Sequence, residues 1–229
     1  VTRTVGLTPL MLACNRHSTS VASALIRAGA TLNDQDRLVG ASALMIAADG
    51  GVEKLLQLLI DAGAVHAHDK KGKQASAYAR AAGHGQLASW LTQLERTAAA
   101  ATSGPPPPLP RQGQSADGTT PGSGEPAAAS DAAEFSGLSS VHWAALSGRM
   151  DVVEGLLRSG VHVDLPSKRG NTALHWASKQ GQQDVVELLI QQGAALNLQN
   201  EVGATALWIA AREGRAHIVK LLLDAGADP

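Results

Sequence analysis

The sequence predicts an all-α solenoid, in which helix-turn-helix units stack on one another and extended, β-hairpin-like loops connect them. Three observations support this prediction. A glycine-led passage recurs along the 229 residues at intervals close to 33 residues. Pairs of aliphatic residues four apart follow each glycine, as on the apolar stripe of a helix. Aromatic residues make up only 3% of the chain, so the core must be aliphatic and alanine-rich, which suits closely packed helices.

The repeats are numbered 1 to 6 after the glycines that begin them: Gly6, Gly40, Gly72, Gly137, Gly170 and Gly203. An alanine lies seven residues after each glycine, and a second glycine lies eleven residues after all but the first. In repeat 5, the pairs Val185-Val186 and Leu189-Ile190 form the stripe of the second helix, and Gly193 follows where a left-handed residue ends a helix. Each repeat is therefore expected to contain a helix, a tight turn, a second helix and a loop.

Three segments are expected along the chain. Residues 1–96 hold repeats 1 to 3, and residues 137–229 hold repeats 4 to 6. Residues 97–136 are rich in Pro, Gly and Ala and lack an aliphatic stripe, so we expect a disordered insertion. The chain starts without Met and stops at "DAGADP", so it is expected to be an excerpt of a longer protein, truncated at its C-terminus.

The insertion leaves two arrangements open. The repeats form either two separate stacks of three or one stack of six with a looped-out segment. Repeat 3 is degenerate, because "GKQASAYARAAGHG" lacks the Thr, the Pro and the Leu of "GLTPL" in repeat 1, so it is either an internal repeat that has lost part of the pattern or a cap. It still offers Leu87, Trp90 and Leu91 for burial, which favours a single stack.

Composition excludes several classes of function. The formal net charge is −1 and no run of like charge is present, which argues against nucleic acid as a partner. No apolar stretch reaches the roughly 18 to 20 residues of a membrane span. The single cysteine, Cys14, fits a reducing compartment, so a cytoplasmic or nuclear location is expected. Without a phosphate loop, a nucleophile motif or a complete metal-ligand set, we expect no enzyme activity and no cofactor.

The passages "GLTPLMLAC" (6–14), "GNTALHWAS" (170–178) and "GATALWIAA" (203–211) resemble the ankyrin repeat, whose pattern runs G-x-T-P-L-H-x-A-A. The resemblance implies a scaffold that binds another protein through its concave face and hairpin tips. It also implies that His142 and His175, which occupy the His position of the pattern, hold the start of the first helix rather than form a ligand site.

The resemblance places eleven residues on the partner-binding surface: Trp143, Leu146, Ser147, Lys168, Arg169, Asn171, Trp176, Lys179, Gln180, Arg212 and Glu213. Trp143 and Trp176 either pack between repeats or form an exposed aromatic step on the groove. If exposed, they would allow an alternative function, the recognition of a methylated lysine peptide in a Trp cage.

Two further hypotheses remain open from the sequence. The repeats are alternatively a regulatory or targeting appendage of an enzyme or channel outside this excerpt. Within the insertion, Pro105 to Pro110 is either a solvated spacer or a ligand for a polyproline-binding domain.

Overall fold

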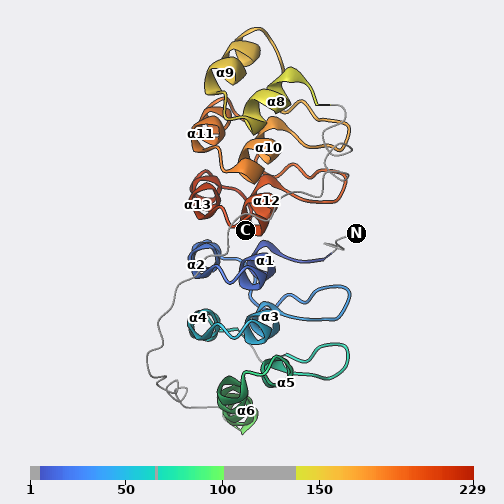
Figure 1. Cartoon of the computed structure of the whole chain (residues 1–229), viewed down its shortest axis with the longest axis vertical. Helices are drawn as coiled ribbons and strands as arrows, with labels where there is room; N and C mark the ends of the chain where they lie inside the picture. Colours follow the sequence, from blue (N-terminus) through green and yellow to red (C-terminus); the bar gives the residue numbers. More distant parts are fainter. Residues whose placement is uncertain (1–5, 65–66, 101–137) are drawn as a thin grey trace.

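The structure is a computed structural model of the whole chain that describes residues 6–64, 67–100 and 138–229. Twelve helices lie in these residues and pack as six pairs, one pair for each repeat (Figure 1). The described residues contain no β-strand, only an isolated antiparallel bridge between Gln35 and Ser42 in one loop. The predicted all-α solenoid is therefore confirmed.

The two helices of each repeat lie in separate rows. The first helices are α1 (Pro9–Asn15), α3 (Ala43–Asp49), α5 (Ala75–Ala81), α8 (Ser140–Leu146), α10 (Ala173–Gln180) and α12 (Ala206–Arg212). The second helices are α2 (Thr19–Arg27), α4 (Glu53–Asp61), α6 (Gly85–Ala100), α9 (Met150–Arg158), α11 (Gln183–Gln191) and α13 (Ala216–Asp224). The extended loops project from the side of the first helices (Figure 1).

The first helices begin where a hydroxyl side chain can cap them. Thr8 accepts a hydrogen bond from the backbone N–H of Met11 at 3.3 Å, and Thr205 accepts one from that of Trp208 at 3.1 Å. Such caps satisfy N–H groups that have no partner inside the helix. Gln74 stands at this position in repeat 3 and makes no side-chain cap, which agrees with the degenerate pattern of that repeat.

The turn between the two helices of repeat 5 requires a glycine. Gly181 ends α10 in the left-handed region with φ of 80°, and a Cβ atom there would lie 3.0 Å from Cδ of Arg215. An L-residue adopts this conformation only at a cost of roughly 1 to 2 kcal/mol. The glycine eleven residues after the start of repeats 2 to 6 thus suits a left-handed backbone, which His17 adopts in repeat 1 with φ of 57°.

We expect Gly181→Ala to lower the free energy of unfolding by about 1 to 2 kcal/mol. Gly155 supplies the matched control, because it lies inside helix α9 and a Cβ atom there would meet nothing within 4 Å. Gly155→Ala should raise the free energy of unfolding by about 0.5 to 1 kcal/mol, since alanine favours a helix interior over glycine. Urea denaturation followed by circular dichroism measures both, and equal effects would contradict the assigned turn.

The core lies between the two rows of helices and runs through the whole stack as one apolar cluster. The leucine nineteen residues after the repeat glycine is fully buried in five repeats: Leu25, Leu59, Leu91, Leu189 and Leu222. Its equivalent in repeat 4, Leu156, is only partly buried. Repeat 4 is the first repeat of the described stack, so no described repeat precedes it, whereas repeat 3 at the opposite end still packs on repeat 2 before it (Figure 1).

The repeats form one stack, but their order is 4–5–6–1–2–3. Helix α12 of repeat 6 packs against α1 of repeat 1, and α13 packs against α2. Repeats 3 and 4, which flank the insertion, lie at opposite ends of the stack (Figure 1). Neither arrangement left open by the sequence describes this order, because both assumed that neighbours in space are neighbours in the chain.

Repeat 3 forms the end of the described stack, and its second helix is longer than the others. Helix α6 continues through residues 97–100, which the sequence placed in the insertion, so that boundary was wrong. Glu95 of α6 is buried and accepts hydrogen bonds from the backbone N–H of Ser76 at 2.9 Å and from its hydroxyl at 2.5 Å. The remaining predicted insertion, residues 101–136, lies outside the described residues.

Candidate protein-binding surface

The C-terminal ends of the first helices follow one another along the stack. Lys179 lies in the last turn of α10 and Arg212 ends α12, and these two helices contact each other. Each basic side chain covers an indole ring of its own helix. Nζ of Lys179 lies 5.4 Å from the ring centre of Trp176, and Cζ of Arg212 lies 5.2 Å from that of Trp208. The stems are thereby positioned while the charged ends remain partly exposed.

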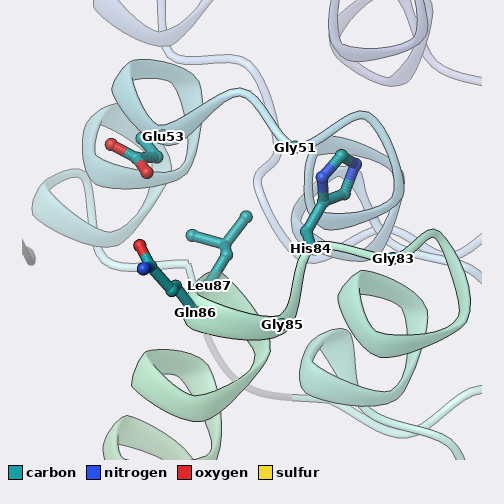
Figure 2. A pocket seen from close by; sticks show the side chains of 7 residues that line it. All are labelled: Gly51, Glu53, Gly83, His84, Gly85, Gln86 and Leu87. Carbon is teal, nitrogen blue, oxygen red and sulfur yellow. The ribbon is translucent and has the colours of Figure 1, made fainter. Parts of the chain in front are cut away.

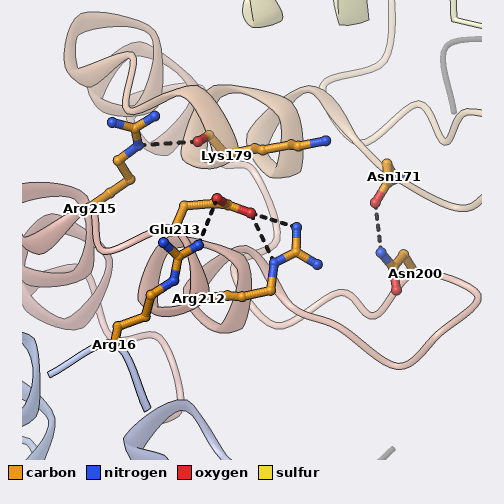
Figure 3. A network of polar contacts seen from close by, with 7 residues as sticks. All are labelled: Arg16, Asn171, Lys179, Asn200, Arg212, Glu213 and Arg215. Carbon is orange, nitrogen blue, oxygen red and sulfur yellow. Dashed lines mark hydrogen bonds and ion pairs between the residues drawn. The ribbon is translucent and has the colours of Figure 1, made fainter. Parts of the chain in front are cut away.

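Glu213 joins repeats 6 and 1 on this surface. Its carboxylate accepts hydrogen bonds from Nη2 and Nε of Arg212 at 2.7 and 2.9 Å, and it pairs with Nη2 of Arg16 at 3.4 Å (Figure 3). Arg16, Lys179, Arg212 and Arg215 lie around this carboxylate, and we call these four residues the basic cluster. The cluster carries an excess of positive charge near the middle of the stack.

The sequence analysis missed Arg16. A positional signal was available, because Arg16 lies ten residues after Gly6, as Glu213 lies ten residues after Gly203. Only the contact between repeats 6 and 1 brings the two side chains together. Half of the Arg16 side chain is exposed, so its guanidinium can form charge-assisted hydrogen bonds with a carboxylate of another molecule.

In repeats 5 and 6, the residue twelve positions after the repeat glycine bonds the repeat before it. Arg215 donates from Nε to the carbonyl oxygen of Lys179 at 3.2 Å, and Gln182 donates from Nε2 to that of Leu146 at 3.3 Å. These side chains complete the last turn of the preceding first helix, whose carbonyl groups lack partners inside the helix.

His142 and His175 hold the scaffold, as the resemblance implied. Nδ1 of His175 accepts from the backbone N–H of Thr172 at 3.1 Å, so Nε2 carries the proton and donates to the carbonyl oxygen of Ala204 at 3.1 Å. His142 makes the equivalent bonds with Ser139 and Leu165. Burial lowers the pKa of both imidazoles, although the hydrogen bond to the carbonyl acts in the opposite direction. Both rings are therefore neutral near pH 7.

The two tryptophans differ in spite of their equivalent positions. Trp143 is 47% exposed, whereas Trp176 is 2% exposed and lies in the core. The assignment of Trp176 to the partner-binding surface was wrong. A methyl-lysine cage built from both rings is wrong for the same reason, because a cage needs converging, accessible ring faces. Trp143 borders an open pocket of about 440 Å³ over α8, together with Leu138 and Ser147.

The hairpin tips supply the second part of the surface. Lys168 and Arg169 are exposed, as expected. Asn171 is buried and accepts a hydrogen bond from Nδ2 of Asn200 at 2.7 Å. Its assignment to the partner-binding surface was wrong, because its side chain joins two neighbouring loops (Figure 3).

Exposed apolar residues at the tips were not recognised in the sequence. Leu38, Val39 and Val202 are 53%, 43% and 72% exposed. Asp36 fixes the loop beneath Leu38 and Val39 by accepting hydrogen bonds from both backbone N–H groups. Burial acts to raise the pKa of Asp36, but these N–H donors outweigh it and lower the pKa overall. Leu38, Val39 and Val202 lie one or two residues before a repeat glycine, Gly40 or Gly203, and this position was the signal that the sequence offered for them.

The remaining expected site residues lie at the surface of the first helices. Leu146 is half-buried, and Ser147 and Gln180 are exposed. Nine of the eleven expected residues therefore keep some exposure, but they are distributed over repeats 4 to 6 and the loops instead of forming one cleft. The arrangement is an extended surface suited to a protein partner.

A pocket between repeats 2 and 3 shows no chemistry of its own. It measures about 260 Å³ and is lined by Glu53, His84 and Gln86, among others (Figure 2). The His84 ring occupies the space that a side chain at Gly51 would need, and its Nε2 bonds the carbonyl oxygen of Asp49 at 3.1 Å. His84 thus makes a contact between repeats.

Other reactive groups are buried or isolated. Burial raises the pKa of the Cys14 thiol to about 12, which keeps it protonated. In the part of the chain that the structure describes, no group of three or more His, Cys, Asp or Glu side chains could hold a metal ion. None of the described helices is long and apolar enough to cross a membrane.

The comparison with known families agrees with this architecture. The family model of ankyrin repeats, in its three-copy form, matches residues 10–101 and again residues 136–229. No curated protein matches the chain significantly.

Proposed function

Because this chain belongs to the ankyrin-repeat family, whose repeats are generally protein–protein interaction modules, we propose that it binds a partner protein along the ends of its first helices and its hairpin tips. The basic cluster supports this proposal best. Its cations are positioned in advance by the rings and carbonyl groups beneath them, so little side-chain entropy is lost when a partner binds.

The surface indicates the chemistry of the partner. Basic side chains lie both in the cluster and at the tips, where Lys168, Arg169, Lys70 and Lys71 are exposed. Val202 is exposed at the tip of the loop between repeats 5 and 6. We therefore infer a partner segment that presents carboxylates together with apolar side chains. Such contacts give specificity and a salt-dependent association rate.

A charge-matched comparison tests the proposal. Partners captured by the full chain are identified first, and their affinities are then measured for the Lys179→Ala/Arg212→Ala variant. We expect this variant to bind about 10-fold or more weakly, since truncating charged contacts at an interface costs upward of 1 to 2 kcal/mol. The loss should diminish at high salt, where exposed charges are screened.

The control is Arg158→Ala/Lys220→Ala, which removes the same charge from two exposed positions on the second helices. It should leave the affinity nearly unchanged. Both variants should unfold within about 1 kcal/mol of the parent protein, because exposed ion pairs and cation–π contacts contribute little. Equal loss of affinity in the two variants would show that net charge, and not this surface, governs binding.

Three finer expectations accompany the proposal. We propose that the protein acts without enzymatic activity and in the cytoplasm or nucleus. Regulation or targeting of a linked enzyme or channel stays a prediction. The hypothesis that Pro105 to Pro110 is a ligand for a polyproline-binding domain concerns a segment that lies outside the described residues.

A further inference from the structure

The contact between repeats 6 and 1 differs from every other contact along the described stack. All other neighbours in the stack are consecutive in the chain, whereas this pair joins the last repeat to the first. We call this contact the 6–1 junction. On the side of the first helices it comprises Leu7, Leu12 and Arg16 of repeat 1 and Ala204, Trp208, Ile209 and Glu213 of repeat 6, and on the side of the second helices α13 packs against α2. It holds the two halves of the chain together without a local peptide connection.

The 6–1 junction reproduces the contact between repeats 5 and 6. Trp208 donates from Nε1 to the carbonyl oxygen of Leu7 at 2.9 Å. His175, five residues after its repeat glycine like Trp208, donates to the carbonyl oxygen of Ala204. Leu7 and Ala204 each come one residue after a repeat glycine. Repeat 1 therefore occupies the position of a seventh repeat and is held there in a defined register.

Apolar packing and an ion pair complete the 6–1 junction. Leu12, Trp208 and Ile209 form a buried cluster with Ala204. Beside it lies the ion pair between Arg16 and Glu213. Two different surfaces meet here, one from each end of the chain, so the contact is heterologous. Every copy of the chain carries both surfaces.

The covalent connection permits the two surfaces to come from different copies. Residues 101–137 connect Ala100 of repeat 3 with Leu138 of repeat 4, at opposite ends of the stack (Figure 1). Six helices packed at 8 to 10 Å place these ends roughly 40 to 50 Å apart. The segment can span at most about 125 Å. A segment of this length allows the 6–1 junction to form within one chain, but it does not force the two surfaces of the junction to come from the same chain.

We propose that the 6–1 junction is a self-association interface and that a second copy of this chain is its partner. In the resulting dimer, repeats 4 to 6 of each copy stack on repeats 1 to 3 of the other. The dimer contains two junctions and so preserves all the contacts of two monomers. The balance between the two forms depends on protein concentration and on the length of the connecting segment. This inference is independent of the proposed partner-binding surface.

Shortening the connection gives the decisive experiment. Replacing residues 101–137 with six Gly and Ser residues limits the reach to about 25 Å, less than the stack requires. The 6–1 junction then cannot form within one chain. Light scattering after size-exclusion chromatography should give twice the mass expected for one shortened chain, while circular dichroism shows an unchanged helix content. A shortened chain that remains monomeric overturns the proposal, because repeats 3 and 4 would then stack directly.

A second variant locates the interface. Trp208→Asp introduces a charge into the buried cluster of the 6–1 junction, and in the shortened chain it should return the mass to that of a monomer. A dimer that persists in this variant overturns the proposal, because another surface would then hold the copies together.

The chain of natural length provides a test that does not depend on the shortened variant. At concentrations of about 10 µM we expect a 23.5 kDa monomer. A dimer should appear as the concentration approaches about 1 mM, the range of effective concentrations for linked modules. Trp208→Asp should abolish it. A monomer throughout this range, together with loss of helix in the shortened chain, also overturns the proposal.

Discussion

Leu189→Ala and Leu222→Ala should each lower the free energy of unfolding by about 2 to 5 kcal/mol. Both side chains are fully buried on the second-helix stripe, α11 for Leu189 and α13 for Leu222. Truncation removes apolar contacts and leaves a cavity between stacked repeats, and close-packed helices relax only partly to fill it. Urea denaturation followed by circular dichroism measures the loss.

Leu156 provides the control at the equivalent position. It lies in repeat 4 at the end of the stack and is only partly buried, so Leu156→Ala should cost less than either of the other substitutions. An equal cost at all three positions would mean that burial by neighbouring repeats does not determine the stability at this site.

Trp208→Ala should have the second large effect, because Trp208 lies in the 6–1 junction. This junction is the only contact in the described residues between repeats 1 to 3 and repeats 4 to 6. Trp208 is 8% exposed, and truncating a buried tryptophan costs about 3 to 5 kcal/mol. Loss of its ring also removes the hydrogen bond to Leu7 and the support of Arg212. We expect calorimetry to resolve two transitions, since two uncoupled modules no longer unfold as one unit.

Two variants calibrate this result. Trp208→Phe keeps most of the apolar volume but loses the Nε1 donor, so it should cost only about 0.5 to 1.5 kcal/mol beyond the change in packing. Trp143→Ala removes a half-exposed ring at the end of the stack and should leave the coupling of the halves intact. A single, unshifted transition in Trp208→Ala would show that the 6–1 junction does not couple the halves.

The sequence predicted the features that depend on local structure. The paired helices, the tight turn between them and the apolar stripes are fixed within one repeat, by interactions between residues close in the chain. The structural role of His175 was also correctly predicted, although its partner Ala204 belongs to the next repeat. Successive repeats are joined by short loops, so this contact follows from the repeat pattern.

The candidate surface was predicted less completely. Lys179, Arg212 and Glu213 lie together as expected, because their positions recur in repeats that are adjacent in both chain and stack. Arg16 joins them from the other end of the chain and was missed. The tip residues Leu38, Val39 and Val202 were missed because position before a repeat glycine does not by itself indicate exposure, which depends on how the loop folds.

By itself the sequence determined the helical repeats and the residues that build them, because their caps, turns and stripes act over a few residues. Only the tertiary structure decided the order 4–5–6–1–2–3 and, with it, the exposure of each repeat. Trp143 and Trp176 have the same local sequence position, yet one is 47% exposed and the other 2%. The physical reason is that burial at this position depends on whether another repeat covers it. When every repeat presents similar faces, the repeat pattern alone leaves open which of them meet.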